Sequence, residues 1–132
     1  MKNLFIAFSL ILFVTSCDII VVEPQYDIRE LFVGRYDIEE YSATYDYSTV
    51  YPISINKSSH NYDEIIITNF YDVNISIYAW VEGNKLTIPL QEVNLYEIEG
   101  TGTLRDHEIH FQYSVRDLYS GGTTDFCQAV AW

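Results

Sequence analysis

The histidines and carboxylates are the residues of this sequence whose types suit catalysis or metal binding. His107-Glu108-Ile109-His110 is the clustered set of possible metal ligands. On a helix its two imidazoles would share one side, but the surrounding residues alternate as in a strand, where residues three apart point to opposite faces. We therefore predict ordinary half-exposed histidines here and no metal site. His60 lies in a polar stretch and is expected to be solvated.

The nineteen Asp and Glu residues make neighbouring carboxylates inevitable, so a carboxylate-dependent glycan hydrolase stays open as an alternative. Nothing in the sequence singles out one pair for this role. The alternation of Asp37, Glu39, Glu97 and Glu99 with apolar residues is typical of solvated strand faces. The sequence contains no Gly-x-Ser-x-Gly nucleophile motif and no phosphate-binding glycine loop. We predict a non-enzymatic protein with no catalytic residues and no cofactor.

An apolar run over residues 4–14 follows Lys2 and leads into Val14-Thr15-Ser16-Cys17. The run is too short to cross a bilayer, which takes roughly 20 apolar residues, but it has the length of the apolar part of a signal peptide. The pattern resembles the signal peptide and lipobox of bacterial lipoproteins. That resemblance implies removal of residues 1–16, lipidation of Cys17 and a location in the bacterial cell envelope, with the outer membrane as the expected site. A plain secretory signal and an uncleaved anchor are the alternatives.

The chain beyond residue 16 is long enough for one domain. We predict a lipid-anchored tether over residues 17–25 and a single β domain over residues 26–132. Without residues 1–16 the chain keeps six Lys and Arg against nineteen Asp and Glu, a formal charge of −13. An acidic surface repels the phosphates of nucleic acids and favours a cationic partner.

Cys127 would have no intramolecular disulfide partner if Cys17 is lipidated. It lies in an apolar stretch, residues 126–132, without a cationic neighbour that would activate a thiol. We predict a small buried side chain.

Period-two alternation of apolar and polar residues dominates the chain and predicts strands with one buried face. Its clearest case is residues 73–81, followed by Gly83-Asn84, a dipeptide suited to a tight hairpin turn. On the return strand, Pro89 lacks a backbone donor and predicts an edge position or a bulge. Gly100 and Gly102, two residues apart, predict sharp bending or close packing against a large neighbour.

Further strands are predicted over residues 33–40, 41–55, 63–70, 95–104, 107–115 and 123–132, after a helical turn within residues 26–32 capped by Asp27. Between Ile38 and Tyr41 the apolar residues change from even to odd positions, which predicts a bulge or turn near Glu39-Glu40. The pattern as a whole predicts an all-β fold of about eight antiparallel strands, forming a barrel or, alternatively, a β-sandwich.

Phe32-Val33-Gly34-Arg35-Tyr36 resembles the glycine-x-aromatic motif in the first strand of lipocalin-like barrels, with tyrosine in place of tryptophan. Together with the lipobox and residues 83–91, 100–104 and 109–115, it makes the chain similar to small lipocalin-like bacterial lipoproteins. The resemblance implies an up-and-down meander closed into a small barrel. It also suggests a cationic side chain packed over Tyr36, for which Arg116 is the nearest candidate. Such a barrel is filled by side chains or holds one small ligand, and the long apolar residues favour filling.

Tyrosine is unusually abundant, with twelve in the sequence. Tyrosines pair across strands and also suit surfaces that bind a partner or a sugar. We predict a membrane-tethered binding module whose ligand-binding residues the sequence does not identify. The expected partners are the membrane, through Cys17, and a small hydrophobic ligand, a glycan or a cationic protein. An inhibitor that sequesters a cationic enzyme is the alternative within binding functions.

Overall fold

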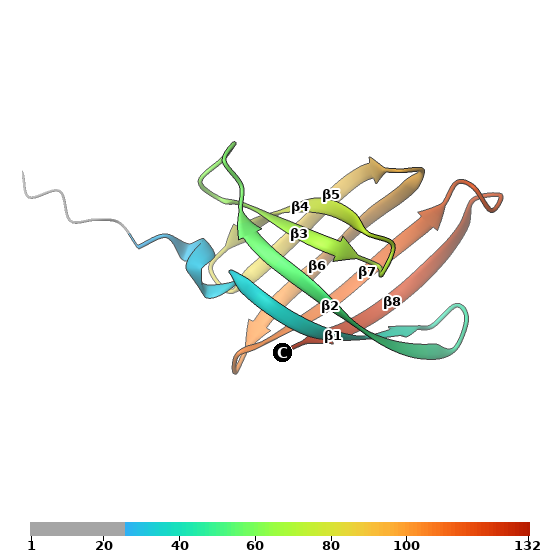
Figure 1. Ribbon diagram of the computed structural model, residues 1–132, viewed down its shortest axis with the longest axis horizontal. Coiled ribbons are helices and arrows are strands. Elements are labelled where there is room, and N and C mark those ends of the chain that lie inside the picture. Colours follow the sequence, from blue (N-terminus) through green and yellow to red (C-terminus); the bar gives the residue numbers. More distant parts are fainter. Residues whose placement is uncertain (1–25) are drawn as a thin grey trace, which may run out of the picture.

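A computed structural model describes residues 26–132 as a closed barrel of eight antiparallel strands (Figure 1). Each strand pairs with the next along the chain, and the last pairs with the first, which excludes the sandwich alternative. A short 3₁₀ helix, η1 (Ile28–Leu31), precedes the barrel. The strands are β1 (Gly34–Ser42), β2 (Tyr47–Lys57), β3 (Glu64–Phe70), β4 (Ile75–Glu82), β5 (Lys85–Val93), β6 (Tyr96–Arg105), β7 (Glu108–Asp117) and β8 (Thr123–Ala131).

The barrel has two ends that differ in composition. The end that carries η1, here called the η1 end, also holds the β2–β3, β4–β5 and β6–β7 connections. The opposite end, here called the distal end, holds the other four hairpin connections, and Figure 1 shows it at the right. Within residues 26–132 there is no helix long and apolar enough to cross a membrane.

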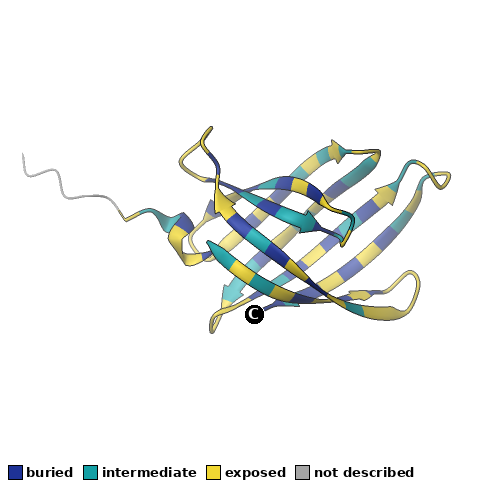
Figure 2. Cartoon of the chain, viewed as in Figure 1, coloured by how far each residue is buried: buried dark blue, intermediate teal, exposed yellow. Residues whose placement is uncertain are grey.

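Alternating side chains fill the interior, as the striped burial pattern along the strands in Figure 2 shows. The prediction for residues 73–81 is confirmed over Ile75 to Val81, where every second side chain is buried. Phe70 and Phe111 lie in the interior, and Phe32 is fully buried beside η1. Bulky Ile side chains from all strands except β8 occupy much of the remaining space.

Gly100 and Gly102 leave room for large aromatic neighbours on β7, as predicted. A Cβ on Gly100 would lie only 2.4 Å from the Cβ of Tyr113, and one on Gly102 would lie 3.1 Å from the ring of Phe111. The missing side chains on β6 therefore allow two aromatic rings on β7 to pack into the interior.

Pro89 interrupts the pairing of β5, and the predicted bulge is present as a register shift between Ile88 and Gln91. The edge alternative is wrong because the closed barrel leaves β5 paired on both sides. The backbone pairing of β5 with β4 covers Lys85 to Thr87. Beyond Pro89, the side chain of Gln91 forms hydrogen bonds with the backbone of β4 instead. Its Oε1 accepts from the Tyr78 N–H (3.0 Å), and its Nε2 donates to the Tyr78 carbonyl (2.9 Å).

The predicted bulge or turn near Glu39-Glu40 is wrong. β1 pairs with β2 without a register shift from Gly34 to Ser42, and the alternation continues through this stretch. The apparent change of phase arises because polar Glu40 and Ser42 face the interior while Tyr41 faces outward. The strand predicted over residues 41–55 is in fact the end of β1, a turn at residues 43–46 and most of β2.

Substitution of Gly100 by alanine tests the close approach of β6 and β7. The added methyl group would overlap the backbone and Cβ of Tyr113, so we expect the free energy of unfolding to fall by about 3 kcal/mol in urea denaturation. Thr101→Ala, on the outward face of the same strand, is the matched control and should cost less than about 1 kcal/mol. Equal stability of the two variants would contradict this packing.

Candidate functional site

The distal end of the interior is polar, whereas the rest of the core is apolar. Glu40 and Ser42 point inward from β1, and Asp125 points inward from β8. The carboxylates of Glu40 and Asp125 belong to residues that are only 4% and 3% exposed. Buried charges are normally paired, so this end of the barrel is the candidate functional site.

Glu40 is held by two tyrosines from other strands. Its Oε2 accepts a hydrogen bond of 2.5 Å from the hydroxyl of Tyr51 on β2, and a second from the hydroxyl of Tyr113 on β7. The ring of Tyr113 packs against Phe70, with centroids 4.7 Å apart. The carboxyl group is thus fixed by neutral donors whose rings belong to the core.

Asp125 is held by a hydroxyl on each of its oxygens. Ser42 Oγ donates to Oδ1, and the hydroxyl of Tyr71, from the β3–β4 turn, donates to Oδ2, each at 2.5 Å. Ser42 Oγ also accepts from the backbone N–H of Tyr45 in the β1–β2 turn (3.0 Å). Asp125 therefore ties two turns of the distal end to β8.

No cation neutralises these two carboxyl groups. Among the described residues, no Lys, Arg or His side chain forms an ion pair with Glu40 or Asp125. Burial raises the pKa of Glu40 to about 7, the hydrogen bond from Tyr51 opposes this shift, and the charges of Asp125 and Asp72 add to it. Glu40 thus keeps its proton well above the pH at which an exposed glutamate loses it.

Cys127 lies on the same inner face, two residues from Asp125, and is buried as predicted. Burial, followed by the nearby charges of Glu40 and Asp125, raises the pKa of its thiol. Burial likewise raises the pKa of the Tyr51 and Tyr71 hydroxyls. A protonated, enclosed thiol is a poor nucleophile, so this geometry suits proton retention better than covalent catalysis.

The η1 end carries a separate polar network centred on Arg29. Nη1 of this buried side chain donates to the carbonyl groups of Ser58 (2.9 Å), Asn61 (2.9 Å) and Glu64 (3.2 Å). Asp27 caps η1, as predicted, and accepts from the Arg29 guanidinium, whose hydrogen bond holds the pKa of Asp27 far below its ordinary value. Arg29 satisfies backbone carbonyls of the β2–β3 loop, which is a structural role.

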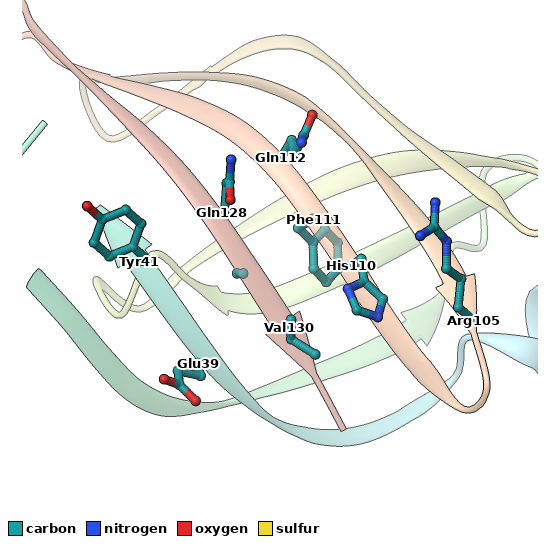
Figure 3. A pocket seen from close by; sticks show the side chains of 9 residues that line it. Glu39, Tyr41, Arg105, His110, Phe111, Gln112, Gln128 and Val130 are labelled. Carbon is teal, nitrogen blue, oxygen red and sulfur yellow. The ribbon is translucent and has the colours of Figure 1, made fainter. Parts of the chain in front are cut away.

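Two of the hollows on the outside of the barrel are lined mainly by strand residues on β1 and nearby strands. One, of about 580 Å³, crosses β1, β8 and β7 (Figure 3), and the other, of about 530 Å³, lies over β1, β2 and β3 near the C-terminus. Tyr41, Gln128 and Gln112 line the first hollow from neighbouring strands. Glu39, His110 and Arg105 lie beside them in Figure 3.

The histidines predicted to bind no metal are not brought together. His107 lies in the β6–β7 turn, whereas His110 lies on β7 with its Nε2 3.3 Å from Glu108. The described residues contain no group of three His, Cys, Asp or Glu side chains placed to hold a metal ion.

The suggested packing of Arg116 over Tyr36 is wrong. Arg116 lies at the distal end, where its Nη2 is 3.5 Å from Glu97, while Tyr36 lies near the η1 end and donates to the Phe32 carbonyl (2.7 Å). Tyr36 is near the start of β1, which lies at the η1 end, whereas Arg116 is near the last residue of β7, which lies at the distal end. Cys17 and residues 1–25 lie outside the described residues.

Sequence reasoning missed Glu40, Asp125 and the tyrosines that bind them. The change of apolar phase at Glu39-Glu40 was the signal, since it is also what an inward-facing carboxylate produces on a regular strand. Asp125 gave a similar signal, because it has the same parity as buried Cys127 and Ala129 on β8.

Comparison with models of known protein families gave no match to the chain, and comparison with curated protein sequences gave none either. The barrel is consistent with a lipocalin-like fold, and the likeness to lipoproteins stays a prediction from the sequence motifs alone.

Replacement of Glu40 by glutamine tests its role in the pH dependence of stability. Because the pKa of Glu40 is raised from 4.5 to about 7 by folding, the folded state holds this proton more tightly than the unfolded state. Its stabilising contribution is complete below pH 4.5 and is lost as the pH rises towards 7, which amounts to about 3 kcal/mol. Chemical denaturation from pH 4.5 to 8 should show this loss in the wild type and not in Glu40→Gln.

Glu99→Gln is the control, because Glu99 is exposed on the outer face of β6. This variant should keep the pH dependence of the wild type. An unchanged pH dependence in Glu40→Gln would mean that Glu40 ionises in the folded protein as it does in the unfolded chain.

Proposed function

We propose that the chain is a lipid-anchored, non-enzymatic binding module of the lipocalin-like type that engages a cationic protein through the outer surface of its distal end. In this proposal residues 1–16 are a signal peptide, Cys17 carries the lipid in the bacterial cell envelope, and residues 26–132 form the binding domain. The observation that carries it is a barrel whose interior is occupied by its own side chains and whose distal end is the more acidic one and also exposes aromatic residues.

The packed interior supports binding on the outside. Large side chains from facing strands meet in the middle of the barrel, including Phe70 with Tyr113. The two interior carboxylates are buried and occupied by hydroxyl donors. A glycan hydrolase would need a pair of carboxylates open to its substrate, and Glu40 and Asp125 give that alternative no support.

The charges of the domain are divided unequally between its ends. Five of the six Lys and Arg residues in the described chain lie towards the η1 end: Arg29, Arg35, Lys57, Lys85 and Arg105. At the distal end Arg116 is the cation, and it is paired with Glu97. Asp46, Asp72 and Glu92 are exposed at this end without an ion-pair partner among the described residues. The distal end therefore presents the more negative surface.

Exposed aromatic rings lie at the distal end, as they also do at the η1 end, where Tyr26 and Tyr62 are 68% and 93% exposed. Tyr45 and Tyr47 flank the β1–β2 turn, Phe126 lies on the outer face of β8, and Tyr119 lies in the β7–β8 turn, each more than half exposed. The β1–β2 turn is held against β8 by the N–H of Ala43, which donates to the Phe126 carbonyl (2.8 Å). Aromatic residues are favoured in protein interfaces, and complementary charge brings partners together.

Lipidation of Cys17 can be tested directly. In bacterial cells the wild-type protein should fractionate with membranes. The Cys17→Ser variant should be released into the soluble fraction, because the substitution removes the residue to which the proposed lipid anchor is attached. Mass spectrometry of the N-terminal peptide should show a diacylated cysteine. Membrane association of Cys17→Ser at the wild-type level would contradict the anchor.

The position of the binding surface can be tested with matched charge substitutions and a lysine-rich peptide of about ten residues as the probe. The distal pair Asp46→Asn and Glu92→Gln should weaken binding about three- to tenfold at low salt. The η1-end pair Asp63→Asn and Glu108→Gln makes the same change of net charge and should alter binding less than twofold. Measurements at pH 5.5 keep Glu40 protonated.

Equal weakening by both pairs would mean that the peptide responds to net charge alone. Absence of binding to the wild type, or binding unchanged by salt, would also count against a surface for cationic partners.

A further inference from the structure

The β3–β4 turn covers the polar end of the interior through one side chain. Tyr71 reaches from this turn across the barrel, and its hydroxyl donates to Asp125 on β8 (2.5 Å). Its ring packs at a tilt against Tyr96 at the start of β6, with centroids 6.1 Å apart. Tyr71 thus bridges strands that are not neighbours in the barrel.

The backbone of this turn is in an unfavourable conformation. Tyr71 has φ +59°, in the left-handed region that bulky side chains rarely adopt, and Asp72, a residue type that tolerates this region better, has φ +55°. The base of the turn is fixed independently, since Asn69 Nδ2 donates to the Pro52 carbonyl (2.8 Å) and Asn69 Oδ1 accepts from the Asn74 N–H (3.1 Å). The tip is held by the Tyr71–Asp125 hydrogen bond and the Tyr71–Tyr96 ring contact. It also has two long backbone hydrogen bonds, from the Asp72 N–H to the Asn69 carbonyl (3.3 Å) and from the Val73 N–H to the Phe70 carbonyl (3.4 Å).

The groups beneath this tip are all acidic or neutral. Glu40 faces the hydroxyls of Tyr51 from β2 and Tyr113 from β7, Asp125 and Cys127 from β8, and Asp72 and Tyr71 from the turn, with Tyr47 at the rim and Ser42 on its own strand. No Lys, Arg or His among the described residues pairs with them. Ionisation of Glu40 would therefore add a second negative charge to a space with no counter-charge, and such a charge is stable only when water reaches it.

We propose that the tip of the β3–β4 turn, Tyr71 and Asp72, is a lid that opens when Glu40 loses its proton and admits water to Glu40 and Asp125. Opening breaks the Tyr71–Asp125 hydrogen bond, relaxes the positive φ angles and leaves the Asn69 contacts at the base intact. It adds two carboxylates to the surface of the distal end. The lid needs no partner, so it stands or fails separately from the proposed binding function.

Cys127 provides a reporter, because it is 3% exposed and lies beside the groups that the lid covers. In the full chain carrying Cys17→Ser it is the one remaining thiol. The rate of its alkylation should be divided by the rate in the urea-unfolded chain at the same pH, which removes the effect of thiol ionisation. The resulting protection should fall about tenfold for each pH unit between 5 and 7 and then level off.

Glu40→Gln should keep high protection across this range, and Glu99→Gln should behave as the wild type. Tyr71→Phe, which loses the hydroxyl and keeps the ring, should show low protection at every pH. A pH-independent protection in the wild type, or an equal fall in Glu40→Gln, would overturn the lid.

Hydrogen exchange of the wild type separates opening of the lid from unfolding of the barrel and needs no substituted chain. After correction for intrinsic rates, the amides of Asp72 and Val73, which donate to the Asn69 and Phe70 carbonyls, should lose protection as the pH rises from 5 to 8. The amide of Asn74 at the base and those of β6 and β7 should keep theirs. A parallel loss in both regions would show global unfolding and would contradict a local lid.

Discussion

Pairing of β1 with β8 is the interaction on which the rest of the structure depends. The two strands match from Ile38 with Ala131 to Ser42 with Cys127. Beyond the ladder, Asp37 and Trp132 exchange both backbone hydrogen bonds, at 3.1 and 3.0 Å. Closure removes the free edges that an open sheet would expose, and it gives every strand one face that water cannot reach. A polar residue whose side chain points into the barrel must therefore find its hydrogen-bond partner inside the barrel.

The two ends of the barrel meet this requirement in different ways. At the η1 end the guanidinium of Arg29 satisfies three backbone carbonyls of the β2–β3 segment, and the carboxylate of Glu64 accepts from Ser58 and Asn61. At the distal end Glu40 and Asp125 are satisfied by hydroxyl groups alone. The η1 end also contains an ion pair, in which Asp27 lies 2.8 Å from the Arg29 guanidinium, whereas Glu40 and Asp125 at the distal end have no cation beside them among the described residues. This difference is the basis of the proposal that the distal end responds to pH.

Much of the fold could be predicted from the sequence, because a strand with one buried face shows regular alternation. The hairpin at Gly83-Asn84 and the strands before and after it are of this kind, and the glycines of β6 were correctly linked to close packing. The bulge assigned to Glu39-Glu40 failed for a physical reason. Alternation was judged by apolar residues, and a buried carboxylate held by tyrosine hydroxyls from β2 and β7 breaks that pattern while the backbone stays regular.

The candidate site itself could not have been assembled from the sequence. Glu40 lies 73 residues from Tyr113, and Ser42 lies 83 residues from Asp125, so their contacts depend on the register around the whole barrel. The same dependence explains the failed pairing of Arg116 with Tyr36. A motif in the first strand does not specify which residue of a later strand reaches the same end.

The most direct test of an interior filled by its own side chains is titration of the protein with a neutral apolar fluorophore such as N-phenyl-1-naphthylamine, at pH 5.5. The wild type should give no saturable rise in fluorescence, whereas Phe111→Ala, which removes a ring that is 2% exposed, should create a cavity and bind the dye. Saturable binding of one equivalent by the wild type, displaced by a fatty acid, would contradict the filled barrel and restore the interior as the ligand site.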